Sequence, residues 1–221
     1  MDPSSFGTVD DAYAARLATT PLESDGPIWM VNFMRYKERA DYGADGDRGL
    51  SGREADDRYA PTDVLADLGA EIAYFGDVIG PDGGPDPEWD RMAIVRYPTR
   101  RSFIEMQERD DFAEQAVHKE AGMAFTIIMC SLPVGPVVGA PEGSGIVRFI
   151  AHPEGSLSPG ERAEGASFEV EGTVIGDQRQ WGRVVISWSD RDEVLPEGTM
   201  VVRSVPFIDR VRPLVDATVR N

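Results

Sequence analysis

Residues 76–80 read Gly-Asp-Val-Ile-Gly, and residues 172–176 read Gly-Thr-Val-Ile-Gly. After a turn, each copy continues with a Trp-x-Arg triplet, at 89–91 and at 181–183, and then with an apolar run. The shared order is a strand that ends in G-x-V-I-G, a turn, W-x-R and a second strand. Self-similarity on this scale indicates two related β-rich halves within one chain.

Further elements surround the first copy and predict its fold. Nearly continuous apolar runs are typical of strands that are covered on both faces. Ser51, with Glu54 three residues on, has the pattern of a capping box at a helix start. The order strand, helix, strand, strand, helix, strand predicts a ferredoxin-like unit, in which both helices cover one face of a four-stranded antiparallel sheet. The predicted elements are strand 28–34, a helical stretch from 51 towards 69, strands 71–79 and 89–97, helix 101–123 with a break near 110–111, and strand 125–130, preceded by a short helix within 9–19.

The second half keeps its strands and shortens the segments between them. The distance from its first strand to G-x-V-I-G is 26 residues (Ile146 to Gly172), against 48 in the first half (Ile28 to Gly76). A sheet without helices still needs cover for its apolar faces, and the open face of the first sheet supplies it most simply. We therefore expect an α+β protein of tandem ferredoxin-like repeats, with antiparallel sheets packed into an α+β barrel and reduced helices in the second repeat. The expected segments are an N-terminal helix and lead-in (1–26), the first repeat (27–131), a linker rich in Pro and Gly (132–145) and a degenerate second repeat (146–221).

Two other architectures stay open. In one, G-x-V-I-G and W-x-R match by chance between two unrelated β-rich halves. In the other, the protein is a homodimer whose first-half sheets face each other across the two chains, and the second half is an interface arm.

The first half resembles a known group of proteins. Over residues 27–131 it is similar to a small uncharacterised family of the dimeric α+β-barrel superfamily. The resemblance implies a ferredoxin-like fold, whereas members of the superfamily include cofactor-independent monooxygenases, small isomerases and lyases, and many proteins without a known reaction. The long hairpin, the N-terminal helix and the whole second half depart from the single-domain pattern and from its usual homodimer. The resemblance rests on Met30-Val-Asn-Phe33, the segment 36–42, Tyr59, the segments 69–76 and 89–98, and Phe103-Ile-Glu-Met106.

The composition limits the partners and the compartment. With 41% hydrophobic and 28% charged residues the chain has a globular composition, and its net charge of −17 disfavours nucleic acid and anionic membranes. Such acidity is typical of a bacterial protein that relies on it for solubility. The single cysteine, Cys130, rules out a disulfide within the chain and fits a cytoplasmic protein. The start of the sequence lacks the pattern of a signal peptide, and no apolar stretch is long enough for a membrane span.

Strong catalytic motifs are absent from the sequence. It contains no G-x-S-x-G, no P-loop, no H-E-x-x-H and no Cys-x-x-Cys. Two histidines and one cysteine do not supply a structural zinc site, although a divalent ion on carboxylates stays open. We therefore expect neither a metal nor an organic cofactor.

Four residues are candidate catalytic groups. In the strand that starts at residue 71, strict alternation places Glu71 and Asp77 on one face, and burial there raises a carboxyl pKa towards neutrality. Asn32 is a polar residue in an apolar strand and could hold a substrate carbonyl or enolate. His118 has a reference pKa near neutrality and suits a proton carrier. The alternatives are solvated or ion-paired carboxylates, a backbone hydrogen bond for Asn32 and a surface or capping role for His118.

Six further residues are candidates for substrate binding. The two arginines of the W-x-R motifs are equivalent under the repeat, and they predict either an anion-binding pair or separate ion pairs. Three tyrosines flank the loop that could cover the barrel mouth, and a second histidine ends a strand; their alternative role is ordinary packing. These residues are Arg91, Arg183, Tyr36, Tyr42, Tyr59 and His152.

These features predict a pocket for a small molecule between the two sheets. The expected function is that of a cofactor-independent lyase, isomerase or monooxygenase acting on a partly apolar carbonyl, phenolic or carboxylic substrate. The alternative is a non-catalytic protein that binds a small molecule or serves in assembly. In either case we expect a monomer with an intrachain barrel, or a homodimer.

Overall fold

The strands form one continuous antiparallel sheet in the computed structural model, which describes residues 6–46, 48–59, 61–80, 89–139, 145–157, 163–189 and 194–220. The strands are β1 (Thr8–Val9), β2 (Ile28–Tyr36), β3 (Glu71–Val78), β4 (Arg91–Tyr97), β5 (Met123–Pro133), β6 (Val147–Pro153), β7 (Ala166–Gly176), β8 (Trp181–Ser187) and β9 (Met200–Asp209). The helices are α1 (Asp11–Thr19), the 3₁₀ turn η1 (Gly43–Asp45), α2 (Gly52–Arg58), α3 (Thr62–Asp67), α4 (Arg100–Gln107), α5 (Asp110–Gly122) and α6 (Val211–Val219).

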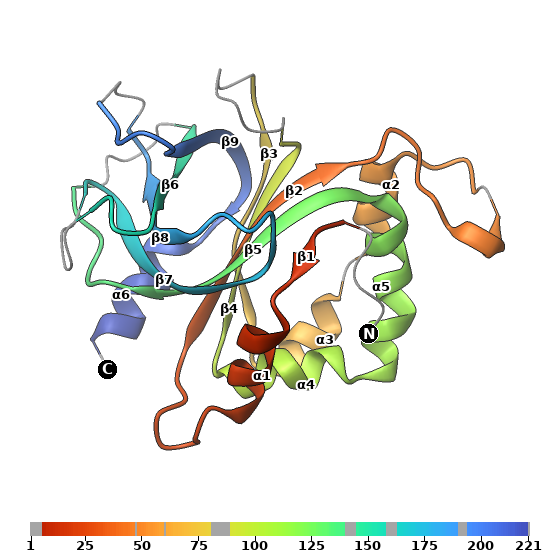
Figure 1. Ribbon diagram of the computed structural model, residues 1–221, viewed down its shortest axis with the longest axis horizontal. Helices are drawn as coiled ribbons and strands as arrows, with labels where there is room; N and C mark the ends of the chain where they lie inside the picture. Colours follow the sequence, from red (N-terminus) through yellow and green to blue (C-terminus); the bar gives the residue numbers. More distant parts are fainter. Residues whose placement is uncertain are drawn as a thin grey trace.

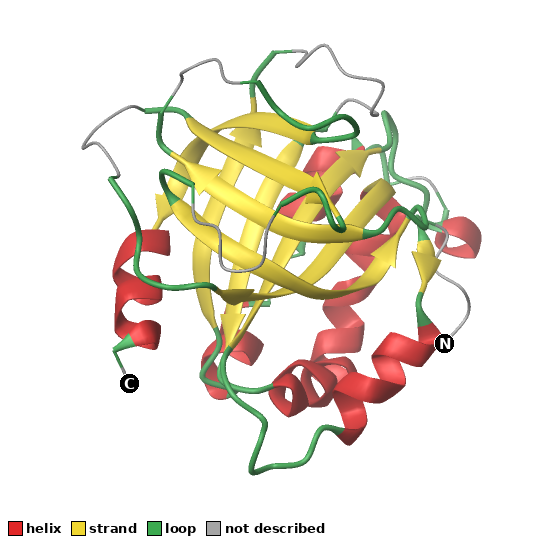
Figure 2. Cartoon of the chain, turned by 60° about the vertical axis from the view of Figure 1, so that its left-hand side comes forward, coloured by secondary structure: helices red, strands yellow, loops and turns green. Residues whose placement is uncertain are grey.

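The sheet closes into a barrel of eight strands. Its order is β7-β5-β2-β4-β3-β9-β6-β8, and a further pairing of β7 with β8 completes the ring, while β1 adds to the far end of β7 (Figure 2). The first half supplies the block β5-β2-β4-β3 and the second half supplies β9-β6-β8-β7. The predicted α+β class and the barrel are confirmed.

Apolar side chains from both halves fill the barrel interior. Trp29 of β2 contacts Phe168 of β7 with ring centroids 5.2 Å apart, and Tyr74 of β3 contacts Phe149 of β6 at 4.8 Å. Full burial of each such side chain contributes about 1.5–3 kcal/mol to stability. Because these contacts join the two halves of the chain, the barrel has one shared core.

Helices cover the outer face of the first half. Trp29, Val31 and Phe33 of β2 belong to the interior core, whereas Met30 belongs to a second core under the helices. This double burial explains the continuous apolar run of β2. Helices α1 to α5 gather on one side of the barrel, and α6 lies apart from them near its other side (Figure 1).

Helix α1 is tied to the second half through the G-x-V-I-G strand. The Tyr13 hydroxyl donates to Glu171 Oε1 at 2.9 Å, and Arg100 Nε donates to the same oxygen at 3.0 Å. A Cβ atom at Gly172 would lie 2.4 Å from the Tyr13 ring. At Gly172, the first residue of the second G-x-V-I-G motif, only glycine therefore leaves room for α1 to pack on the sheet.

Several predicted boundaries change in the structure. The predicted helix 101–123 is split at Glu108 and Arg109 into α4 and α5, and the stretch after Ser51 is split into α2 and α3. The capping box of Ser51 and Glu54 is confirmed. β5 runs to Pro133, two residues into the predicted linker, and α6 is an element that the sequence analysis missed. Most of the predicted hairpin 80–87 and the linker residues 140–144 lie outside the described residues.

The faces predicted for β3 need correction. Ala73 is a β-bulge against β4, because Ile72 pairs with Val95 and Tyr74 pairs with the adjacent Ile94. As a result Ala73 and Tyr74 both contact the barrel core, and Phe75 packs on the outside. Strict alternation along this strand was therefore wrong.

Candidate functional site

A buried arginine brings together three carboxylates at the ends of β3 and β4. Arg91 is 4% exposed, and its Nη1 lies 3.1 Å from Asp56 Oδ2 and 2.7 Å from Asp57 Oδ1. Its Nε donates to Asp77 Oδ1 at 2.9 Å. The Tyr36 hydroxyl donates to Asp56 Oδ2 at 2.5 Å. Three sequence-predicted residues, Tyr36, Asp77 and Arg91, thus meet in one network together with two carboxylates of α2.

A second arginine extends this network towards solvent. Arg53 Nη1 lies 2.6 Å from Asp77 Oδ1, and Arg53 Nη2 donates to the backbone oxygen of Asp90 at 3.4 Å. Asp90 in turn accepts a hydrogen bond from the Tyr36 backbone N–H at 2.7 Å. Burial raises the pKa of the Tyr36 hydroxyl well above its ordinary value, and the negative charge of Asp56 raises it further. The network fixes α2 against β2, β3 and β4, and it keeps Tyr36 protonated.

A tyrosine–histidine pair joins the segment after β2 to α5. The Tyr42 hydroxyl is 2.8 Å from His118 Nδ1, and the two rings meet edge to face at 5.6 Å. The Arg48 guanidinium lies 4.2 Å from the centroid of the Tyr42 ring. Burial lowers the pKa of His118, and the positive charges of Arg48 and Arg58 lower it further. His118 is therefore a neutral imidazole near pH 7, able to accept a proton.

A lysine on the neighbouring position of α5 faces α2. Lys119 Nζ lies 5.2 Å from the centroid of the Tyr59 ring, and Tyr59 also packs edge to face on Phe112. Burial lowers the pKa of Lys119, and Asp56 partly opposes this effect. The sequence analysis singled out Tyr59 and missed Lys119.

The two remaining catalytic candidates lie apart from these groups. Asn32 donates through Nδ2 to the backbone oxygen of Met30 at 2.9 Å, which matches the backbone-bonding alternative. Glu71 lies half-exposed at the start of β3, where it pairs with Arg96 at 3.4 Å and with Arg210 at 3.1 Å. The structure brings neither residue to the Tyr42–His118 pair.

Arg183 and His152 lie on the opposite side of the barrel. They are register partners on β8 and β6, and both side chains are buried. The Thr199 hydroxyl is 3.4 Å from His152 Nδ1. Because β4 and β8 are four strands apart in either direction around the ring, Arg91 and Arg183 do not share a site.

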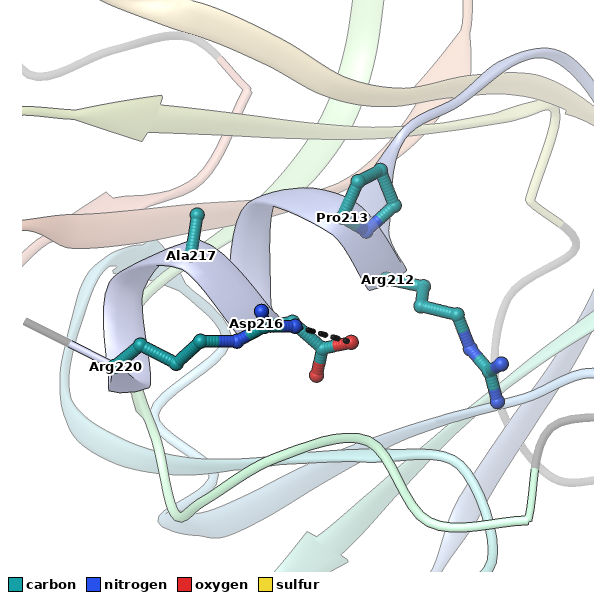
Figure 3. Close-up of a pocket in the computed structure, with 5 residues that line it drawn as sticks. All are labelled: Arg212, Pro213, Asp216, Ala217 and Arg220. Atoms are coloured by element: carbon teal, nitrogen blue, oxygen red, sulfur yellow. Dashed lines mark ion pairs between the residues drawn. The ribbon is translucent and has the colours of Figure 1, made fainter.

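A surface hollow lies beside α6, away from all of these groups. It is lined by Arg212, Pro213, Asp216, Ala217 and Arg220, with Asp216 and Arg220 paired at 4.0 Å (Figure 3). No sequence-predicted site residue contributes to it. In the described part of the chain, no three or more His, Cys, Asp or Glu side chains are arranged to hold a metal ion. Nor does any described helix have the length and apolarity needed to cross a membrane.

The fold and its polar groups define an α+β protein with a closed eight-stranded antiparallel barrel and a charged helical side. No family model matches the chain, and no curated protein matches it. Among solved structures it is similar to the methylated RPA0582 protein over 56% of this chain and 93% of that chain, with 27% identity and a TM-score of 0.48. It is also similar to the RPA0582 protein of unknown function from Rhodopseudomonas palustris, over 56% of this chain and 95% of that chain, with 27% identity and a TM-score of 0.47.

Proposed function

We propose that this protein is a cofactor-independent enzyme of the isomerase or lyase class, with the Tyr42–His118 pair as its proton-transfer site. The observation that carries this proposal is the 2.8 Å contact between the Tyr42 hydroxyl and His118 Nδ1. A base held by a second polar group is a common arrangement for general acid–base catalysis. This site lies on the helical side of the first half and not between the sheets, because apolar side chains of both halves pack against one another inside the barrel.

The pair can take a proton from a carbon next to a carbonyl group. When Nδ1–H donates to the Tyr42 oxygen, Nε2 of His118 keeps a lone pair that can accept this proton. The lowered pKa of His118 keeps the imidazole in this neutral form at pH 7. Arg48 supplies a positive charge beside the pair and favours a substrate that also carries a carboxylate. The substrate class is therefore a partly apolar keto acid.

We expect the protein to catalyse exchange of the protons next to the carbonyl of phenylpyruvate with deuterium from solvent. His118→Gln should slow this exchange by about 100-fold, the usual contribution of a general base. The rate should rise with pH through the pKa of His118, which lies below its ordinary value of 6.5, and then level off. Proton NMR in D2O measures the exchange.

The control for this experiment is Glu114→Gln. Glu114 is exposed one turn earlier on the same helix, so its loss should leave the exchange rate unchanged. Equal rates in wild type and His118→Gln would overturn the proposed site. Binding of phenylpyruvate without exchange would favour the second function, a small-molecule-binding protein without catalysis.

We also infer that the two halves are tandem ferredoxin-like repeats. In the block β5-β2-β4-β3 the strands follow the order fourth, first, third, second, and the block β9-β6-β8-β7 follows the same order. The W-x-R motif begins the third strand in both halves, and the two arginines lie on opposite sides of the ring. This common order favours duplication over a chance similarity of two unrelated halves. The second repeat then differs by the loss of its two covering helices.

We expect the protein to be a monomer, because one chain already closes the barrel through the β3–β9 and β5–β7 seams. Light scattering after gel filtration should give the mass of one chain, 24.2 kDa. A mass of two chains would favour the homodimer alternative. We place this monomer in the cytoplasm, where the buried thiol of Cys130 stays reduced.

A further inference from the structure

The chain uses arginine almost exclusively for its positive charges. Of its 22 basic residues only two, Lys37 and Lys119, are lysines. The ion pairs between described residues are made by arginines, including the pairs that hold Asp56 and Asp77. Arginine stays charged in proteins, whereas a lysine amine can lose its proton when it is buried. A buried lysine is therefore conspicuous in this chain.

Lys119 lies on the inward stripe of α5. Phe112, Ala116 and Lys119 are spaced i, i+4 and i+7, and the first two pack into the core under the helices. The Lys119 ammonium group lies over the Tyr59 ring at 5.2 Å. The residue as a whole is half-buried.

Asp56, the carboxylate whose charge acts on this amine, is already engaged by other groups. Asp56 accepts from the Tyr36 hydroxyl at 2.5 Å and pairs with Arg91 at 3.1 Å. Among the residues that the structure describes, Lys119 makes neither an ion pair nor a hydrogen bond, and its interactions are with the Tyr59 ring and, at longer range, the Asp56 charge. Burial in this setting lowers the pKa of Lys119. The neutral amine is thus more populated at pH 7 than in an ordinary lysine.

We propose that Lys119 is a nucleophilic amine that forms a Schiff base with the carbonyl group of a small aldehyde or ketone. The nitrogen lone pair attacks the carbonyl carbon, a C–N bond forms, and the C=O π electrons move to the oxygen, which takes up a proton as the nitrogen loses one. This hydroxyl then takes up a second proton and leaves as water. The nitrogen lone pair forms the C=N bond, which gives the protonated imine. Asp56 then supplies a negative charge near the new cation.

This inference rests on the proposed function and deepens it. A protonated imine withdraws electrons from the neighbouring C–H bond, and that is the bond whose proton we assign to His118. Lys119 and His118 are adjacent residues of α5, and Arg58 of α2 lies close enough to lower the pKa of His118. Helices α2 and α5 pack against each other (Figure 1), and both the Lys119 amine and the His118 ring lie near the end of α2, beside Tyr59 and Arg58 respectively.

The test is reductive trapping of the full-length protein with phenylpyruvate and cyanoborohydride at pH 7, read by peptide mass mapping. Lys119 should gain the reduced adduct at least about fivefold faster than Lys37, since the rate follows the fraction of neutral amine. Lys37 is the internal control, because it is half-buried like Lys119 but donates through its Nζ to the Glu120 backbone oxygen at 3.4 Å. Lys119→Arg keeps the positive charge and should form no adduct. Lys119→Met, with an uncharged side chain of similar length, should also form no adduct. Lys37→Arg should keep it.

The outcomes separate this inference from the proposed function. Labelling of Lys37 at the rate of Lys119, or an adduct that persists in Lys119→Arg and Lys119→Met, overturns it. Deuterium exchange by a protein that forms no adduct overturns the Schiff base and leaves the His118 proposal standing. An adduct on Lys119 that forms without any deuterium exchange supports the nucleophilic amine and removes His118 as the base.

Discussion

Replacing Arg91 by methionine is expected to lower the free energy of unfolding by about 3–5 kcal/mol, the usual cost of removing one partner from a buried charge pair. Asp56, 5% exposed, would lose its arginine and keep only the Tyr36 hydroxyl. Asp57 and Asp77 would lose the same partner. Methionine fills a similar volume, so most of the loss comes from uncompensated carboxylates and little from a cavity.

Urea unfolding followed by tryptophan fluorescence measures this loss. The matched control is Asp57→Asn, which removes a 55% exposed carboxylate from the same arginine. This change should cost less than about 1 kcal/mol, because Arg91 keeps Asp56 and Asp77 and the lost pair is screened by water. If Arg91→Met unfolded within 1 kcal/mol of wild type, the network would not be what fixes α2 to the sheet.

The Arg91 network has a consequence for the candidate site. Asp56 lies near Lys119, and Tyr59, which ends α2, lies under the Lys119 ammonium group. The position of α2 against β2, β3 and β4 therefore sets the surroundings of the amine. A charged network of this kind fixes one arrangement of the helix, which a purely apolar contact specifies less strictly.

Periodicity within single elements was enough to predict most of the barrel. The continuous apolar run of β2 indicated burial on both faces, and the structure places Trp29 inside the barrel and Met30 under the helices. The same approach failed for β3, where a bulge at Ala73 shifts the faces, because a bulge depends on the neighbouring strand. Helix α6 carried a readable signal in Val211 and Val215, which are one turn apart and both pack into the barrel core.

The site was predictable only in part, because its groups come from separate elements. Tyr36, Asp77 and Arg91 meet since β4 lies between β2 and β3 in the sheet. Asp56 and Asp57 were missed because their contacts depend on how α2 packs, and no periodicity within α2 encodes that angle. Lys119 had a signal, namely its rarity and its place on an apolar stripe.

The equivalence of Arg91 and Arg183 was visible in the sequence, but its meaning was not. An anion-binding pair was one of two hypotheses, and the closed ring separates the two side chains by four strands in each direction. β4 and β8, which carry the two arginines, lie on opposite sides of the barrel. Arg91 pairs with carboxylates of the first half of the chain.

Replacing Gly52 by alanine is expected to cost about 3 kcal/mol, because the packing of α2 on α5 leaves no room for a side chain. A Cβ atom there would lie 2.4 Å from the backbone oxygens of Gly122 and Lys37, and 2.8 Å from the Lys37 nitrogen. Backbone atoms cannot rotate aside, so the cost lies near the top of the overpacking range of about 1–3 kcal/mol. Two hydrogen bonds would also stretch, from Lys37 N to Gly122 O at 2.8 Å and from Gly52 N to Lys37 O at 3.0 Å.

Gly26→Ala is the matched control, since a Cβ atom at Gly26 meets nothing within 4 Å. It should be neutral or stabilise the protein by up to about 1 kcal/mol, because alanine restricts the unfolded chain. Urea unfolding compares the two variants, and reductive labelling of each reports on the site. Once α2 is displaced, Lys119 loses its contact with Tyr59, and its labelling rate should fall towards that of Lys37. An unchanged midpoint together with unchanged labelling in Gly52→Ala would show that the close approach of α2 and α5 does not shape the surroundings of Lys119.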